Sequence, residues 1–417
     1  MNDERPFRIR AGAILDPGDP PVERATLTVE AGRLVAVERE GEGDPRLPLV
    51  DLSDHLLLPG FVNAHCHLSL SVLENRVSRQ ERFTGWVRDL LAENERISFA
   101  ERVEAFRRGA DTLTNSGVTL LGDYVSHPEL FPEYSTLPFR SVLFLETLGF
   151  RGEVCREVCE RVRGLLMDHG SKGDRFRLGI APHAPYSVSP GLFRELKEMA
   201  DRFNAPFSCH VAEFPEEVRF LREGGGELET FLRERGVFDP AWNPPQTTPV
   251  RYLDGLGVLK GMAAVHLNHI EGDLDVLVQQ GAGAVFCPGS TRWFGRSPII
   301  PVRALLDRGV PVALGTDSLA SNESLNFLRE LKLAEAMLTD VSRVEILQMA
   351  TRFGAQVLGP SPDAGTLALG APADVVGFRV ESRPAYWKDV PFESGRERAD
   401  FVMVGGRVAV GERPRAE

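Results

Sequence analysis

The sequence predicts an α/β fold: a (β/α)8 barrel of the TIM type, with a small β-sandwich domain that both chain termini build together. Eight strand-like segments alternate with helical ones in the middle of the chain, and six of its nine histidines lie at or just beyond strand ends. Both termini carry short alternating strands. An open doubly wound sheet also explains the alternation, but it predicts neither eight units nor histidines at strand ends. We expect residues 1–58 and 363–417 to form the sandwich and residues 59–362 the barrel.

The barrel strands are predicted from apolar runs bounded by turn residues. Between them, Ser189–Phe203 has the clearest helical spacing, with an apolar face that includes Phe203. Helical patterns also occur at Glu216–Arg235, where Gly224–Gly226 predicts a bend, and at Val302–Arg308. The proline-rich segment Asp239–Pro249 is expected to be an ordered surface loop near the barrel mouth. The predicted strands are Phe61–His65, Val118–Tyr124, Ser141–Thr147, Phe176–His183, Phe207–Glu213, Ala263–His269, Ala284–Cys287 and Val312–Asp317.

Composition excludes several classes of protein. The net charge is −12 and the pI about 5.4, with both signs mixed along the chain, whereas nucleic-acid binding needs a concentrated basic surface. No apolar run is long enough to cross a membrane, and the first residues do not resemble a signal peptide. Five scattered cysteines without CxxC spacing indicate a reducing cytoplasm. We therefore expect a cytoplasmic protein that binds neither nucleic acid nor a membrane.

The first strand ends in His65 and His67, which are spaced i, i+2. Alternate residues of an extended chain point the same way, so both imidazoles can face one ion. Taken alone, the pair fits two hydrogen-bonded rim histidines equally well. The apolar segment Leu56–Phe61 predicts a buried strand that leads directly to this pair of histidines, and this context favours a metal site.

Two later strand ends offer further ligands. His210 lies inside the fifth strand with Glu213 three residues on, which suits a metal ligand beside a proton shuttle. Glu213 could equally be the first acidic residue of the next helix. Asp317 follows the eighth strand directly, where an aspartate is costly unless it binds something, although it could cap the next helix.

Three imidazoles and one carboxylate suit Zn²⁺, with Fe²⁺ or Mn²⁺ as alternatives. His266 could orient or polarise the reacting water and substrate, and His269 is expected to be structural. No lysine lies on the third or fourth strand to bridge two metals, so one ion is expected. Nucleophilic catalysis by serine or cysteine is disfavoured, because Gly-x-Ser-x-Gly is absent and Cys66 alternates away from its histidine neighbours.

These motifs resemble the amidohydrolase superfamily, in its deaminase and chlorohydrolase branch. The resemblance spans nearly the whole chain, including the return to the terminal domain at Gly365–Val376. Five motifs carry it in order: Pro59–His67, Ala181–Ser189, Cys209–Glu213, Ala264–His266 and Leu314–Asn326.

The resemblance implies roles for individual residues. It assigns metal binding to His65, His67, His210 and Asp317. Glu213 and His266 match the family's catalytic pair, and Asp317 is a further proton acceptor. His183 and Glu213 match residues that contact the substrate. The implied reaction is attack of an activated water on an amine-bearing ring carbon, with Glu213 protonating the ring nitrogen and then the departing amine. A homodimer is expected by analogy.

Within the branch, the chain looks most similar to deaminases of 6-aminopurine nucleosides, especially those acting on 6-amino-6-deoxyfutalosine in menaquinone biosynthesis. The segment Cys287–Arg296 supports this likeness, and Arg292 in it is predicted to contact a substrate carboxylate or else to lie on a surface loop. Ser69 stands where an acidic residue is expected, so the substrate could differ. The alternatives are a methylthioadenosine/S-adenosylhomocysteine or guanine-type deaminase, a chlorohydrolase, or a cyclic amide hydrolase.

Overall fold

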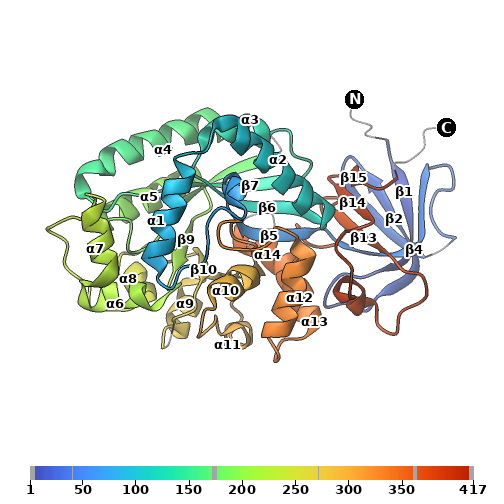
Figure 1. The fold of residues 1–417 in the computed structure, drawn as a ribbon. Coiled ribbons are helices and arrows are strands. Elements are labelled where there is room, and N and C mark those ends of the chain that lie inside the picture. Colours follow the sequence, from blue (N-terminus) through green and yellow to red (C-terminus); the bar gives the residue numbers. More distant parts are fainter. Residues whose placement is uncertain (1–4, 40, 171–175, 271, 360–363, 413–417) are drawn as a thin grey trace.

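The computed structural model describes residues 5–39, 41–170, 176–270, 272–359 and 364–412. It shows two bodies side by side: a barrel ringed by helices, and a β domain that carries both described chain ends (Figure 1). The predicted fold class, a (β/α)8 barrel with a β-sandwich domain from both termini, is confirmed.

The β domain is built around a seven-stranded sheet in the order β15-β14-β13-β4-β1-β2-β3. Its pairs are antiparallel except β1 with β4, and C-terminal β13 pairs with N-terminal β4 through Val375 and Pro59. A separate apolar core fills this domain. The strands are β1 Phe7–Ile14, β2 Val22–Glu30, β3 Arg33–Arg39, β4 Leu49–Pro59, β13 Val375–Arg379, β14 Phe401–Val404 and β15 Arg407–Val410.

The barrel consists of eight parallel strands in sequence order, as predicted. Two four-stranded sheets, β5-β6-β7-β8 and β9-β10-β11-β12, are joined at both seams. The Ile180 amide donates to the Pro206 carbonyl at 2.9 Å, and the Thr316 amide donates to the His65 carbonyl at 2.9 Å. The strands are β5 Phe61–Cys66, β6 Val118–Val125, β7 Arg140–Thr147, β8 Phe176–Pro182, β9 Ser208–Val211, β10 Ala263–His266, β11 Gly283–Phe286 and β12 Val312–Leu314.

The chain passes from the β domain into the barrel between Pro59, the last residue of β4, and Phe61, the first of β5. This crossing lies beside the predicted boundary at 58/59. The second predicted boundary, at 362/363, lies outside the described residues.

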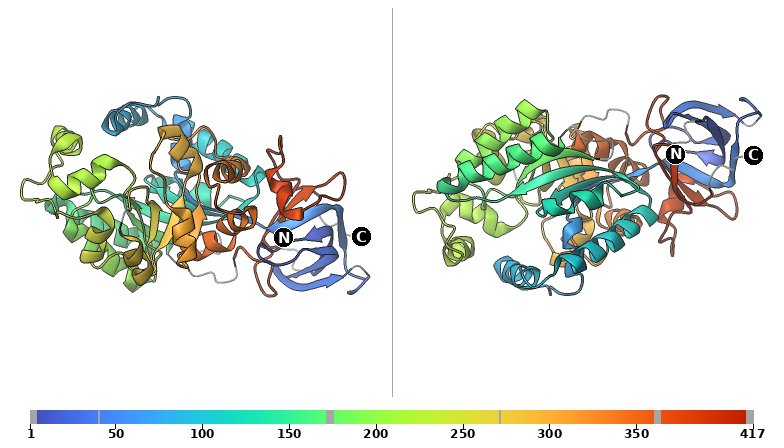
Figure 2. Two further views of the ribbon diagram at one scale, coloured as in Figure 1. Left: turned by 90° about the horizontal axis from the view of Figure 1, so that it is seen from below. Right: turned by 90° about the horizontal axis from the view of Figure 1, so that it is seen from above.

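Helices surround the barrel, and α1 stands at its outer edge in both views of Figure 2. They are α1 Phe83–Asn94, α2 Phe99–Asn115, α3 Phe131–Tyr134, α4 Cys155–His169, α5 Pro190–Phe203, α6 Pro215–Glu223, α7 Gly226–Glu234, α8 Pro249–Gly255, α9 Leu274–Gln280, α10 Pro288–Phe294, α11 Val302–Asp307, α12 Phe327–Met337, α13 Arg343–Met349 and α14 Arg352–Leu358, with 3-10 turns η1 Leu68–Leu73, η2 Pro128–Leu130, η3 Gly152–Val154 and η4 Trp387–Phe392.

The predicted bend at Gly224–Gly226 is confirmed, because Gly224 and Gly225 adopt φ values of 74° and 67° that a continuing helix cannot contain, and the segment forms two helices. One helix prediction needs correction. Helix α5 buries its predicted face except for Phe203, which is 38% exposed because Asn204 turns the chain away in the left-handed conformation.

Two further features bear on the sequence predictions. No described helix is long and apolar enough to cross a membrane. The segment Asp239–Pro249 consists of turns and irregular chain up to the start of α8 at Pro249, and its Trp242 stacks on Phe220 with 4.4 Å between ring centroids.

Candidate active site

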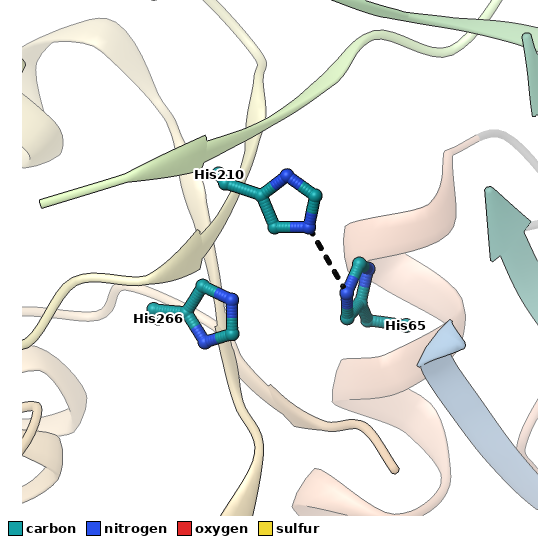
Figure 3. A group of neighbouring side chains, drawn as sticks. All are labelled: His65, His210 and His266. Atoms are coloured by element: carbon teal, nitrogen blue, oxygen red, sulfur yellow. Dashed lines mark hydrogen bonds between the residues drawn. The ribbon is translucent and has the colours of Figure 1, made fainter. Parts of the chain in front are cut away.

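Three imidazole nitrogens and one carboxylate oxygen meet at the carboxyl end of the barrel. His65 and His67 stand at the end of β5, His210 on β9 and Asp317 just after β12, and all four are buried. The Nε2 atom of His210 lies 3.3 Å from Nε2 of His65 and 3.4 Å from Nε2 of His67. The Oδ1 atom of Asp317 lies 3.7 Å and 3.8 Å from the same two atoms. Figure 3 shows His65 and His210 pointing toward each other, with His266 beside them.

This spacing fits one tetrahedrally coordinated cation. With ligand bonds of about 2.05 Å, neighbouring ligand atoms of a tetrahedral zinc site lie about 3.4 Å apart. The imidazole pairs, at 3.3 Å and 3.4 Å, match that value, and the carboxylate oxygen is slightly more distant. Buried imidazole nitrogens this close repel each other unless a proton or a cation lies between them. The donor set therefore fits zinc or another first-row divalent ion.

Protonation also favours a cation. Burial lowers the pKa of His65 to about 4 and lowers the pKa of His210 well below its usual value. Burial would raise the pKa of Asp317, but the hydrogen bond with His65 and the neighbouring histidine charges lower it well below its usual range. At neutral pH His65 and His210 are neutral and Asp317 is ionised, which is the state that binds a metal.

Neighbouring groups orient two of these side chains. The Nδ1 atom of His210 lies 2.9 Å from the main-chain carbonyl of His183, which leaves Nε2 to face the cluster. The Ser290 hydroxyl donates to Oδ2 of Asp317 at 2.6 Å. Asp317 does not cap a helix, because α12 begins ten residues later with Asn326 as its N-cap. The capping alternative is therefore wrong.

Glu213 and His266 form a second buried pair beside the cluster. Oε2 of Glu213 lies 3.8 Å from Nε2 of His266, and the His266 ring stacks on that of His210 at 5.4 Å. Glu213 precedes α6, which begins at Pro215, so it is not the first acidic residue of that helix. The geometry suits Glu213 to move a proton at the edge of the cluster.

Glu217 holds Glu213 in place, a role that sequence reasoning missed. Its two carboxylate oxygens accept the amide N–H groups of Ala212 and Glu213, each at 2.9 Å. Burial raises the pKa of Glu217 to about 8, although these two bonds lower it. Its position in the first turn of α6 resembles that of any surface glutamate at a helix start, so no sequence signal marks it.

The ends of three barrel strands carry strained backbone. Ala212, His266, Leu267 and Asp317 adopt φ values of 53°, 77°, 51° and 59°, a region that non-glycine residues rarely occupy. Such conformations cost free energy and collect at functional sites. His266 and Asp317 are themselves predicted to carry the chemistry, and Ala212 and Leu267 are the sequence neighbours of Glu213 and His266.

A cavity of about 700 Å³ opens from the cluster. Its inner end includes His183, whose Nδ1 atom lies 2.7 Å from the Ser187 hydroxyl oxygen. Aromatic side chains in its lining include Phe83, Trp86, Tyr186 and Phe294. Apolar side chains in its lining come mainly from α1, α4 and α7, and include Leu90, Leu91, Leu148, Val158, Phe231 and Leu232. The lining also contains the charged side chains of Arg151, Glu157, Arg161 and Arg235, of which the last three are exposed.

Other residues singled out from the sequence lie elsewhere. Arg292 is exposed on α10 and does not line the cavity, so the surface alternative holds for it. Ser69 is buried in η1 and His269 follows β10, and neither lines the cavity. A different arginine, Arg296, reaches Glu213 with an Nη2 to Oε1 distance of 2.9 Å.

The sequence matches the model of one protein family. The model of the Amidohydrolase family matches residues 56–409, a span that contains every residue of the cluster. The chain belongs to the amidohydrolase family. This amidohydrolase is therefore a hydrolase acting on carbon–nitrogen bonds other than peptide bonds, as the sequence predicts.

Three known proteins illustrate the likeness. A 5′-deoxyadenosine deaminase of Methanothermobacter thermautotrophicus is 28% identical over 97% of this chain and 93% of its own. An aminodeoxyfutalosine deaminase of Deinococcus radiodurans is 32% identical over 73% of each chain. The crystal structure of an adenosine deaminase from Xanthomonas campestris with bound zinc superimposes with a TM-score of 0.83 at 24% identity, covering 99% of this chain and 94% of that one. At that identity the structure supports the fold alone.

Proposed function

We propose that this amidohydrolase is a hydrolytic deaminase of an adenine-bearing nucleoside. The observation that carries the proposal is the convergence of His65, His67, His210 and Asp317 beside Glu213 at the inner end of a cavity that can hold a nucleoside. The two curated relatives described above are both named as deaminases of such nucleosides. The four converging side chains are the proposed ligands of one divalent ion, most favourably zinc.

A bound divalent ion would supply a Lewis acid that brings the pKa of a water molecule toward neutrality. Asp317 takes the proton that this water gives up, and His266 orients the water and the ring. The water oxygen bonds to the amine-bearing ring carbon while Oε2 of Glu213 protonates the adjacent ring nitrogen. Glu213 then takes the proton of the new hydroxyl group and gives it to the amine, the carbon–nitrogen bond breaks, and ammonia leaves, while the proton held by Asp317 returns Glu213 to its starting state. His183 contacts the substrate at the cavity wall.

The cavity favours 6-amino-6-deoxyfutalosine within this class, which would make the enzyme part of menaquinone biosynthesis. Besides aromatic side chains, the cavity is lined mainly by apolar ones, and three arginines and one glutamate also belong to its lining. A benzoate-bearing tail matches both properties, because its ring can pack on the apolar walls and its carboxylate can pair with a guanidinium. Exposed Leu148 (56%) and Val237 (41%) on this wall would be covered by such a tail.

The test is ammonia release by the zinc-loaded enzyme from a panel of substrates. We expect 6-amino-6-deoxyfutalosine to have the highest kcat/KM, ahead of 5′-deoxyadenosine, methylthioadenosine, S-adenosylhomocysteine and guanine. Glu213→Gln should abolish ammonia release. Glu216→Gln, in the first turn of the following helix α6, should leave it unchanged. Release from no nucleoside, with turnover of a chlorotriazine or a cyclic amide, would refute the deaminase proposal.

The proposed pairing of the benzoate carboxylate with cavity arginines is tested by a double variant and a control variant. Replacing Arg161 and Arg235 by Gln should raise KM for the carboxylate-bearing nucleoside about tenfold and leave KM for 5′-deoxyadenosine unchanged. Arg163→Gln, on the same helix α4 but outside the cavity lining, is the control. An equal rise for both substrates would contradict the assignment.

A further inference from the structure

We propose that Arg296 is a positioning residue of the reaction. In this proposal it holds one oxygen of the Glu213 carboxylate, so that the other oxygen alone exchanges protons. The inference rests on the proposed function, because it assigns Glu213 the proton transfer. Arg296 lies outside the five motifs that carry the family resemblance, and the resemblance assigns it no role in catalysis.

The contact between the two residues is direct and shielded from water. Nη2 of Arg296 lies 2.9 Å from Oε1 of Glu213, and the two side chains are 13% and 10% exposed. Gly295 ends α10 in the left-handed conformation, and the Arg296 amide then donates to the Thr291 carbonyl at 2.9 Å. This turn directs the side chain back toward the barrel end rather than into solvent.

Three phenylalanine rings surround the guanidinium. Its central carbon lies 4.2 Å from the ring centroid of Phe294, 5.4 Å from that of Phe214 and 5.6 Å from that of Phe83. These rings come from α10, from the residue before α6 and from the start of α1, and Phe83 and Phe214 stack at 3.9 Å. Each ring face attracts the cation. The cage therefore keeps the guanidinium in one place while excluding water from the ion pair.

Apart from its contact with Glu213, the surroundings of Arg296 give it no other evident role. Within the described residues its Nε atom is buried and makes no hydrogen bond. Arg296 does not line the cavity, so it is not placed to bind a substrate anion. Burying a charge with an incompletely satisfied guanidinium is unfavourable for stability alone, because apolar side chains pack such a site at less cost. The arrangement is explained if the position of the Glu213 carboxylate matters for the reaction.

The consequence is a carboxylate fixed from both ends. Glu217 holds the Glu213 main chain through its amide, and Arg296 holds Oε1. Oε2 is left on the side of His266, 3.8 Å from its Nε2 atom. A proton carried by Glu213 therefore sits on Oε2, facing the place where the ring nitrogen would lie. Preorganisation of this kind affects the chemical step more than binding.

The test compares steady-state kinetics of Arg296→Ala with the wild type on the nucleoside that the wild type hydrolyses best. We expect kcat to fall about 100-fold, the effect of misplacing a reacting group by about 1 Å, while KM changes less than threefold. Added guanidinium at millimolar concentration should restore kcat at least tenfold, and Arg296→Lys should retain part of it. Arg308→Ala, which removes an exposed pair with Asp275, is the control and should change nothing.

Several results would overturn the inference. An unchanged kcat excludes a role, and a rise in KM alone assigns Arg296 to substrate binding. Loss of bound zinc and of thermal stability without guanidinium rescue assigns it to structure. If the wild type hydrolyses no nucleoside, the proposed function fails by itself. The positioning role is then judged from crystal structures, in which Glu213 must leave its wild-type rotamer in Arg296→Ala; an unmoved carboxylate refutes it.

Discussion

Removing the Glu217 carboxylate should destabilise the protein and slow the reaction together. Its two oxygens satisfy two buried amide groups, those of Ala212 and Glu213, at 2.9 Å each. A buried N–H left without a partner costs about 1–3 kcal/mol. Glu217→Ala leaves two such groups and should lose about 4 kcal/mol of unfolding free energy. Glu217→Gln keeps one acceptor, turns a donor toward the other amide, and should lose about 2 kcal/mol.

The functional effect follows from the same contacts. Ala212 is held at a φ of 53°, and without the carboxylate the strand end that carries Glu213 relaxes. We expect kcat to fall in the same order, with the larger loss in Glu217→Ala. Urea unfolding followed by circular dichroism gives the stability, and ammonia release gives the rate.

A neighbouring residue supplies the control. Glu216 lies in the same first helical turn but is only partly buried, so Glu216→Gln changes only the interaction of a charge with the helix dipole, about 0.5 kcal/mol. If Glu217→Gln proves no more destabilising than Glu216→Gln, the two amide bonds do not support the active-site loop, and the reasoning is refuted.

Three further predictions use different measurements. His67→Asn should weaken zinc binding by more than about 100-fold, which is the effect of losing a residue that only hydrogen-bonds to a metal ligand. Full zinc content of this variant after dialysis would contradict the assignment of His67 as a ligand. Gly122→Ala should lower the free energy of unfolding by about 3 kcal/mol and also weaken zinc binding, because its Cβ would lie 2.6 Å from the carbonyl oxygen of Ala64, the residue before His65. The control Gly164→Ala has open space around its Cβ and should raise the free energy of unfolding by about 0.5 kcal/mol. Burial raises the pKa of Glu330 to about 8, so the folded state holds an extra proton between about pH 4.5 and 8, and stability relative to Glu330→Gln should fall by about 1.4 kcal/mol per pH unit as the pH rises through that range. A pH-independent difference between the two unfolding free energies would show that Glu330 is ionised throughout.

The sequence predicted the residues whose position depends on strand register. His65 and His210 lie near the ends of apolar strands and His67 directly follows one, and the period of two along an extended chain fixes which side chains point the same way. Asp317 could be assigned for a similar reason, because it directly follows a buried strand. The order of eight parallel strands then brings these four residues together.

Residues that act through tertiary contacts could not be predicted in this way. Arg292 and Arg296 are separated by about one helical turn, and only the left-handed turn at Gly295 decides which one reaches Glu213. Glu217 has the sequence context of a surface glutamate, yet the packing of α6 buries it completely. Their roles depend on how elements distant in sequence pack together, which no local period records.

The seam between the first and last barrel strands also bears on how the protein matures. The His65 carbonyl accepts the amides of Thr316 and Asp317, at 2.9 Å and 3.0 Å, so the first and last proposed ligands meet only where the ring of strands closes. During synthesis, a chain that has emerged only as far as β11 carries the three histidines without the carboxylate. The complete set of four proposed ligands therefore forms only after synthesis has passed Asp317 and the barrel has closed, which would couple four-ligand metal binding to the completion of folding.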